Sequence, residues 1–156
     1  MSKSRSQIKI MGKYRFTKTN SLTGAILERT EWYENLVMAG SDYGIGLFTR
    51  ALADVAPIPL AITQLQIGQG TTAPTDADTG LEDMTVDEIL IANFSRSTDE
   101  VQFDFFVPSA MLPNGTYSEI GIFTGDNIFA RSIVSPAFTK SSNEDTSIEY
   151  IISFSN

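Results

Sequence analysis

The amino-acid sequence predicts a single mainly-β domain, an antiparallel β-sandwich of jelly-roll-like type with one packed α-helix and an N-terminal β-hairpin. Apolar residues alternate with polar ones in several short runs between residues 62 and 156, which is the period of strands with one buried face. Turn-forming residues separate these runs about every ten residues, a spacing typical of sandwiches and barrels. With 156 residues the chain is long enough for one hydrophobic core. We therefore expect residues 7–156 to form one β-rich domain.

The N-terminal hairpin is expected over residues 7–34. Its first strand is apolar on one face, with Ile10, Tyr14 and Phe16, and basic on the opposite face. A polar turn then precedes a return strand over residues 25–33. Acidic residues of the return strand lie within reach of the basic face and can pair with it across the hairpin.

The one segment with helical periodicity is residues 41–56. Ser41 or Asp42 can supply the N-cap, and Pro57 ends the helix soon after its last apolar residue. Apolar residues at steps of three and four form the face expected to pack on the sheet: Ile45, Phe48, Leu52 and Val55.

The sandwich strands are expected to fill residues 62–156. The alternation is clearest in residues 101–107 and 146–154. Residues 117–124 and 128–133 are joined by Gly-Asp-Asn, a sequence typical of a tight hairpin turn. These runs predict antiparallel strands that share one core.

The composition removes several classes of chemistry. The chain contains no cysteine and no histidine, so thiolate catalysis, cysteine zinc sites and Ser-His-Asp triads are excluded. We therefore expect no enzyme activity, no cofactor and no metal site. No apolar run approaches the ~20 residues that cross a bilayer, so we expect no membrane association.

The net charge of −8 is distributed unevenly. Residues 1–30 carry seven basic side chains and one acidic one, whereas residues 31–156 carry four basic and eighteen acidic ones. A body with this excess of acid repels phosphate, so nucleic acid is not an expected partner. The asymmetry instead favours a basic arm or face that docks on an acidic protein surface.

Residues 1–6 are small, polar and basic, and are expected to form a flexible arm. Together with the basic face of the hairpin, this arm is the expected docking surface, and removal of residues 1–18 is expected to leave soluble protein that no longer docks. A solvated surface without a partner is the alternative. The docking residues are Lys3, Arg5, Lys9, Lys13, Arg15 and Lys18.

The stretch from Gln66 to Leu81 contains several turn-forming residues, and its three glycines are available for positive φ. A dinucleotide-binding loop needs a third glycine where the chain has Ala73. A calcium loop needs an oxygen ligand where the chain has Gly80. The sequence therefore predicts a structural turn at four positions: Gly68, Gly70, Pro74 and Gly80.

Two charged residues interrupt strands that are otherwise apolar. Glu119 lies in the middle of one strand and Arg131 in the middle of the strand that follows it across the predicted hairpin. Charges inside strands are normally paired. We expect a partly buried Glu119–Arg131 ion pair that fixes the register, and a ligand-binding carboxylate is the alternative.

Four motifs together resemble a family of bacteriophage tail-fibre, tail-collar and baseplate-type virion proteins. The most specific is Gly68-x-Gly70-Thr71-Thr72-Ala73-Pro74-Thr75, in which Gln69 replaces a more usual threonine. This motif continues with Asp78, Thr79 and Leu81. The other three are Glu34-Asn35-Leu36-Val37, Glu119-Ile120-Gly121-Ile122-Phe123 and Phe129-Ala130-Arg131. The resemblance covers about residues 30–155.

The resemblance implies a structural virion component, made in the cytoplasm of a bacterial host, that assembles with itself and docks on neighbouring virion proteins. A homotrimer is expected by analogy with the family. The chain ends at Asn156, directly after the shared domain, which favours an adaptor, collar, head-fibre or capsid-decorating role over direct host recognition. Two other classes stay open: a carbohydrate-binding module with Trp32 and Tyr33 as a sugar platform, and a hydrolase that uses only carboxylates.

Overall fold

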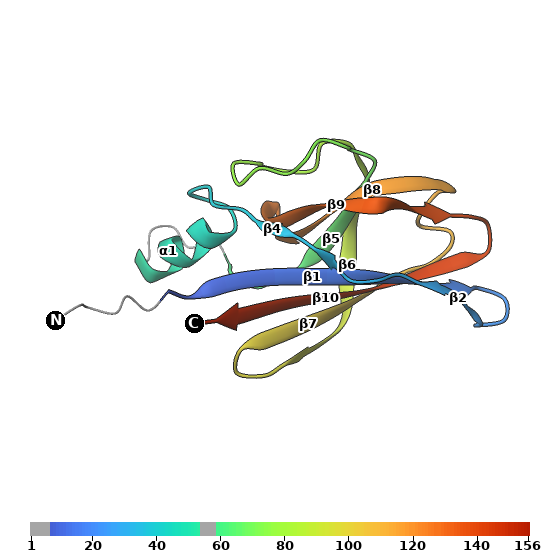
Figure 1. Cartoon of the computed structure of the whole chain (residues 1–156), viewed down its shortest axis with the longest axis horizontal. Coiled ribbons are helices and arrows are strands. Elements are labelled where there is room, and N and C mark those ends of the chain that lie inside the picture. Colours follow the sequence, from blue (N-terminus) through green and yellow to red (C-terminus); the bar gives the residue numbers. More distant parts are fainter. Residues whose placement is uncertain (1–6, 54–58) are drawn as a thin grey trace.

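The computed structural model describes residues 7–53 and 59–156. These residues form one helix and ten strands, and the predicted mainly-β, antiparallel, sandwich-like fold is confirmed (Figure 1). The elements are β1 (Lys9–Asn20), β2 (Ile26–Arg29), β3 (Tyr33–Glu34), β4 (Leu36–Val37), α1 (Ile45–Ala53), β5 (Gln64–Gly68), β6 (Met84–Arg96), β7 (Glu100–Val107), β8 (Gly115–Thr124), β9 (Asn127–Lys140) and β10 (Glu144–Ser155).

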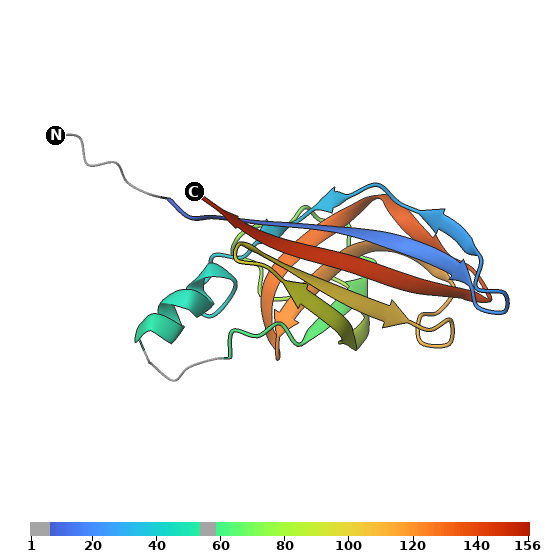
Figure 2. The same ribbon diagram turned by 90° about the horizontal axis from the view of Figure 1, so that it is seen from below.

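The strands form one curled sheet in the order β2-β1-β10-β7-β6-β5-β8-β9-β4, and β3 pairs with β1 in addition. Every neighbouring pair is antiparallel. Strand β6 belongs to both halves of the curl, because its first half pairs with β5 and its second half with β7. The curl brings β1, β10 and β7 over β9, β8 and β5, so that two layers enclose the core (Figure 2).

The core fills the space between these two layers. The predicted alternation is confirmed in β7 and β10, whose inward-facing residues are mostly buried. Tyr14 of β1 stacks on Tyr150 of β10, with ring centroids 5.4 Å apart. Phe16 crosses to the other layer and stacks on Phe138 of β9 at 4.6 Å. These contacts make β1 part of the core.

The N-terminal hairpin forms, but its return strand is interrupted. Strand β2 ends at Arg29, and a separate short strand, β3, pairs with β1 further along. Glu28 pairs across the hairpin with Lys18, whose Nζ lies 2.7 Å away. Lys18 lies on the same face of β1 as Tyr14 and Phe16, over the ring of Phe138, so this pair is not on the expected basic face.

The helix differs from the prediction in its start and in part of its buried face. Phe48 packs against the core as expected, next to Phe129 and Phe154. It begins at Ile45, because a tight turn that includes Gly44 at φ +52° occupies the residues before it. Leu47 is fully buried, whereas Ile45 is 46% exposed and Leu52 is 88% exposed. Asp42 forms an ion pair with Arg50. The predicted helical residues 54–56, including Val55, and Pro57 lie outside the described residues.

The segment from Tyr33 to Val37 joins the two ends of the curled sheet, a feature that the sequence did not predict. Strand β3 pairs with β1, and the next strand, β4, pairs with β9 (Figure 1). Asn35 lies at the crossing: its backbone N–H donates to the carbonyl of Gly12 at 3.1 Å, and its side-chain amide donates to the hydroxyl of Tyr150. The sheet is therefore almost closed into a barrel at this point.

Candidate functional site

The most elaborate polar site in the described residues is centred on Glu119 and Arg131. Glu119 lies in β8 and Arg131 in the adjacent β9, and their exposed fractions are 0% and 3%. The Nε and Nη2 atoms of Arg131 donate to Oε2 of Glu119 at 3.1 and 2.9 Å. The ion pair expected from the sequence is therefore present, and it is fully buried.

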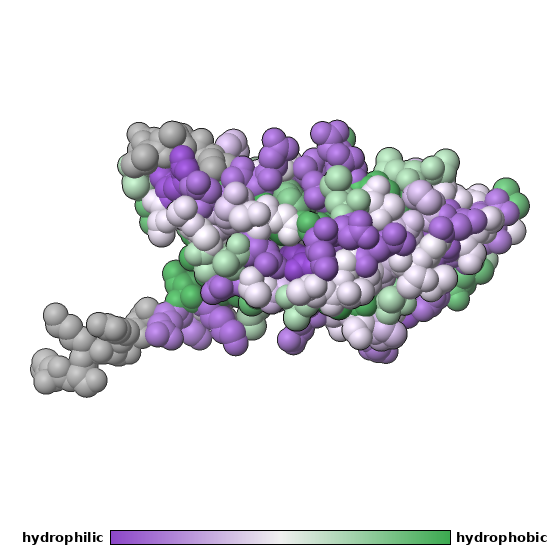
Figure 3. Space-filling view, turned by 90° about the horizontal axis from the view of Figure 1, so that it is seen from above, coloured by the Kyte–Doolittle hydropathy of each residue, from purple (hydrophilic) through white to green (hydrophobic). Residues whose placement is uncertain are grey.

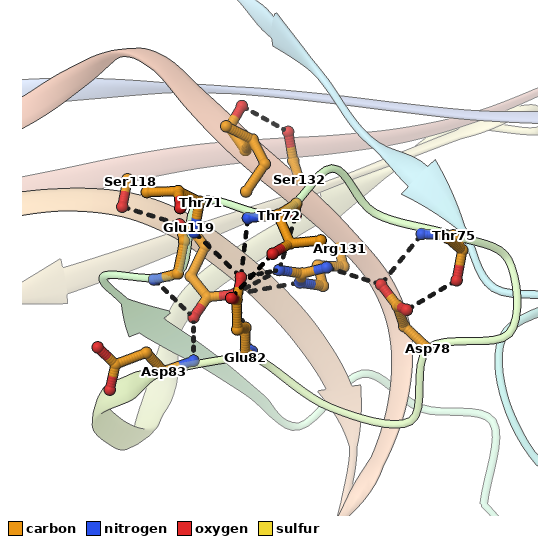
Figure 4. A network of polar contacts seen from close by, with 12 residues as sticks. Thr71, Thr72, Thr75, Asp78, Glu82, Asp83, Ser118, Glu119, Arg131 and Ser132 are labelled. Carbon is orange, nitrogen blue, oxygen red and sulfur yellow. Dashed lines mark hydrogen bonds and ion pairs between the residues drawn. The ribbon is translucent and has the colours of Figure 1, made fainter.

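The Glu119 carboxylate also accepts three backbone N–H groups from the loop between β5 and β6 (Figure 4). The donors are Gly70 at 3.1 Å, Glu82 at 3.0 Å and Asp83 at 2.6 Å. A buried carboxylate is stable only when its oxygens are paired or hydrogen-bonded. Glu119 thus meets this requirement by holding both ends of the loop, residues 69–83, against the sheet.

Arg131 holds the middle of the same loop. Its Nη1 atom donates to Asp78 at 2.7 Å, and its Nη2 atom donates to the carbonyl of Thr72 at 3.1 Å. A third carboxylate, Glu82, lies 3.5 Å from Nη2. Burial works against the charged guanidinium, but the hydrogen bonds to Asp78 and Glu119 outweigh it and raise the pKa of Arg131.

Asp78 and Glu82 each close a turn of the loop as well as contacting Arg131. Asp78 accepts the backbone N–H and the hydroxyl of Thr75, at 3.1 and 2.8 Å. Burial opposes ionisation of Asp78, but the bonds from Thr75 and Arg131 prevail and lower its pKa. Hydrogen bonds from Thr72 lower the pKa of Glu82 in the same way.

The sequence did not predict Asp78 and Glu82 as partners of Arg131. Both acids lie far from Arg131 in the chain, so no local spacing connects them. The sequence did contain a usable signal. Arg131 is a single cation inside a strand, whereas the loop at residues 69–83 carries several acids that could balance its charge.

The predicted turn positions all lie in or beside this loop, but the expected reason for the glycines was wrong. Gly68, Gly70 and Gly80 do not have positive φ. A Cβ atom would lie 2.6 Å from Oε1 of Glu119 at both Gly68 and Gly70, whereas at Gly80 it would meet nothing within 4 Å. Gly70 is therefore required because the Glu119 carboxylate approaches its backbone closely, and Gly68 because both this carboxylate and the carbonyl oxygen of Asp83, which would lie closer still to the added Cβ, approach it. Pro74 lies in the loop itself.

The site holds a loop in place by hydrogen bonds and charge. Its guanidinium and its three carboxylates all have protein partners. Among the described residues, no group of three or more histidine, cysteine, aspartate or glutamate side chains is arranged to hold a metal ion. In the same part of the chain, no helix is long and apolar enough to cross a membrane.

The residues of the expected docking surface have different environments. Arg15 pairs with Glu149, and its Nη2 atom lies 3.1 Å from that carboxylate. Lys18 pairs with Glu28, as described above. Lys9 and Lys13 are exposed, whereas Lys3 and Arg5 lie outside the described residues. Part of the basic face is thus neutralised within the chain.

Trp32 and Tyr33 do not form a common platform. Lys13 and Arg15 lie over the Trp32 ring, at 5.0 and 4.4 Å from its centroid. Tyr33 instead stacks on the buried Tyr14, with ring centroids 5.3 Å apart. Because the two rings have separate surroundings, the contacts do not favour the sugar-binding alternative.

Comparison of the chain with models of protein families, with curated proteins and with solved structures gave no match in any of the three. The resemblance to phage virion proteins therefore stays a prediction that depends on the motif residues. Several of these residues meet in the ion-pair network: Gly68, Gly70, Thr71, Thr72, Thr75, Asp78, Glu119 and Arg131.

Proposed function

We propose that the protein is a structural component of a bacteriophage virion, at the tail, collar or baseplate or at a fibre attachment, and that it acts by self-assembly and by docking to neighbouring virion proteins. One observation carries this proposal. The motif residues that resemble the virion family converge on the buried Glu119–Arg131 network, where they fix the loop at residues 69–83 to the sheet. The resemblance thus concerns residues that build the fold.

A clamped loop suits a docking role. A loop of this length without secondary structure is ordinarily mobile, and ordering it on binding reduces affinity. Here the loop is already fixed by Glu119 and Arg131, while two of its acids, Asp76 and Asp83, remain exposed. The loop therefore presents a rigid acidic surface to a neighbour.

The charge distribution supports contact between copies or with other virion proteins. Exposed Lys9 and Lys13 lie at the basic end of a chain whose remaining body is strongly acidic. Complementary surfaces of this kind steer encounter and fix register. By analogy with tail fibres we propose a homotrimer.

Intact particles provide the test of this function. Phage particles purified from a lysate of the host are analysed by quantitative mass spectrometry and by electron microscopy with a labelled antibody. We expect a fixed copy number and label at one symmetric position. Absence from purified particles, with the protein left free in the lysate, would contradict the proposal.

Self-assembly is tested separately on the purified protein by sedimentation velocity over a range of concentrations. We expect a trimer. A monomer at every concentration would contradict self-assembly.

A further inference from the structure

The curled sheet has an open seam between β1 and β4. Strand β3 pairs with β1 in the register Tyr14↔Tyr33 and Lys13↔Glu34. If this register continued, Val37 would lie opposite Ile10. The chain instead leaves β1 at Asn35 and pairs with β9, so that the two edges separate (Figure 1).

On each side of the seam, one described residue has backbone groups without a partner across it: Ile10 on β1 and Val37 on β4. On β1, the carbonyl of Gly12 faces the seam side, because it accepts the N–H of Asn35, and Ile10 faces the same side two residues away. On β4, Met38 donates its N–H to Phe129 of β9, so the adjacent Val37 points away from β9. Among the described residues, neither Ile10 nor Val37 has a backbone hydrogen bond across the seam. Unpaired strand edges of this kind are templates for another strand.

The seam opens into a cavity of about 510 Å³, a volume typical of ligand sites. Figure 3 shows the surface hollowed between the lobe that carries α1 and the beginning of β1, with apolar side chains at its base. Asn35 lines the closed end, and its side-chain oxygen is buried without a hydrogen-bond partner among the described residues. The other lining residues are Lys9, Ile10, Met11, Gly12, Lys13, Glu34, Leu36, Val37, Ile45, Glu100 and Ser153.

We propose that residues 1–6 of a second copy of this chain enter the seam as an extended strand. The proposal rests on the self-assembly proposed above and names the contact that joins the copies. Two unpaired edges recognise a main chain rather than a compact small molecule. The occupant therefore has to be an extended peptide.

Position and length favour the N-terminal arm as that peptide. Residue 7, the first described residue, leads into β1 at the end where the seam opens, and six extended residues span about 20 Å. Lys3 and Arg5 fall on the same face of an extended strand. Glu34 and Glu100 line the seam, are exposed and form no ion pair within the described part of the chain, but the exposed Lys9 and Lys13 line it too. Position and length, not net charge, therefore single out the arm.

The arm of the same chain is a poorer occupant. It would have to reverse direction within residues 6–9 in order to run back along β1. This segment, Ser-Gln-Ile-Lys, contains none of the glycine, asparagine, aspartate or proline residues that favour tight turns, and Ser6 is its only turn-favouring residue. Exchange between two copies needs no such turn.

Because the chain has no cysteine, single cysteines allow a clean test. A Ser4→Cys protein is mixed with a Leu36→Cys protein under mild oxidation, and disulfide-linked heterodimers are quantified on non-reducing gels. Leu36 lines the seam and is 38% exposed. The matched control is Leu22→Cys, because Leu22 is more exposed, at 78%, and lies in the turn between β1 and β2 at the far end of the molecule. We expect at least ~5-fold more heterodimer with Leu36→Cys than with Leu22→Cys, since the arm raises the local concentration at the seam.

Sedimentation velocity on the same mixtures measures the oligomeric state, and so distinguishes a failure of arm exchange from a failure of self-assembly. If oligomers form but Leu36→Cys cross-links no better than Leu22→Cys, arm exchange is wrong while self-assembly stands. If the protein is monomeric at every concentration, both proposals are wrong. If one chain carrying both Ser4→Cys and Leu36→Cys forms a disulfide within a monomer, its own arm occupies the seam. The proposal that the arm comes from a second copy is then wrong.

Discussion

Glu119 and Glu149 each pair with an arginine, but their surroundings differ. The Glu119–Arg131 pair is buried and surrounded by further hydrogen bonds, whereas the side chains of Arg15 and Glu149 are each about one-quarter exposed, at 25% and 27%. Removing one partner of a buried pair takes a compensating charge away from a group that water cannot reach. In a partly exposed pair, water solvates the charge that remains. The two pairs therefore allow a controlled comparison of the same chemistry.

We expect Glu119→Gln to lower the free energy of unfolding by about 3–5 kcal/mol, because the new NH2 group would face N–H donors of the loop or of Arg131 in a buried site. The control Glu149→Gln should cost at most about 1 kcal/mol. Urea unfolding with an unchanged m-value measures both. Equal losses in the two variants would show that the buried network is not the stronger interaction.

The close approach of Glu119 to Gly70 gives a second comparison at the scale of single residues. In Gly70→Ala the new methyl group would lie 2.6 Å from Oε1 of Glu119, so we expect a loss of about 1–3 kcal/mol from overpacking. Gly80→Ala adds a methyl group in open space, and its effect should stay within about 0.5 kcal/mol. Thermal or urea unfolding measures the stability of both variants. A Gly70→Ala protein as stable as the wild type would contradict this account of the loop.

The loop at residues 69–83 behaves as an element because carboxylates hold it on the sheet. Asp78 and Glu82 have lowered pKa values in the folded protein. Groups of this kind bind more protons when unfolded, so the stability they provide is complete above their unfolded pKa of about 4 and is lost as the pH falls through the lowered folded values. Arg131 stays charged throughout this range, because its pKa is raised.

We therefore expect stability to be level between about pH 7 and pH 5 and to fall below about pH 4. Asp78→Asn should make this fall shallower, because it removes one of the linked groups. Glu149 also has a lowered pKa but lies outside the loop. The control Glu149→Gln therefore shows how much of the fall in stability comes from an acid elsewhere in the protein. Urea unfolding at a series of pH values is the measurement, and identical pH profiles for Asp78→Asn and the wild type would contradict the linkage.

The helix gives a prediction of its own, because its buried face differs from the one expected by periodicity. Leu47 is fully buried in the core and Leu52 is largely exposed. Leu47→Ala should cost about 2–5 kcal/mol through the cavity it leaves, and Leu52→Ala should stay within about 0.5 kcal/mol. Urea unfolding compares them, and the reverse order would mean that α1 packs through the face containing Leu52.

At the scale of the whole molecule, β1 is an interior strand of the sheet. It lies between β2 and β10 and buries Tyr14 and Phe16. The expectation that a chain lacking residues 1–18 stays folded and soluble is therefore not compatible with the fold. Docking residues and core residues share this segment, so a deletion has to stop before β1.

We expect a protein that lacks residues 1–6 to keep the cooperative unfolding of the full chain, because these residues precede the sheet. A protein that lacks residues 1–18 should lose cooperative unfolding, since it lacks most of β1. Circular dichroism and urea titration distinguish them. Cooperative unfolding of the shorter protein would show that β1 is dispensable for the fold.

Much of the fold could be predicted from sequence because strand alternation is a local property. The patterns in residues 101–107 and 146–154 matched β7 and β10, and the mid-strand charges Glu119 and Arg131 indicated a paired site. The helix face was predicted only in part: Phe48 packs on the core, but Leu47 is buried by contacts with the rest of the core, which helical spacing alone does not report. The reason for Gly70 was also missed, since it depends on a side chain 49 residues away.

By itself, the sequence determined that this chain forms antiparallel strands with one helix, a basic hairpin and an ion pair inside the sheet. Periodicity, turn residues and the cost of an unpaired charge act over short distances, so they can be seen in the chain. Only the tertiary structure decided that the loop at residues 69–83 is held by Glu119 and Arg131, and that the sheet stays open between β1 and β4. Both features depend on how far the sheet curls, which is the sum of many strand pairings and is not encoded at any one position.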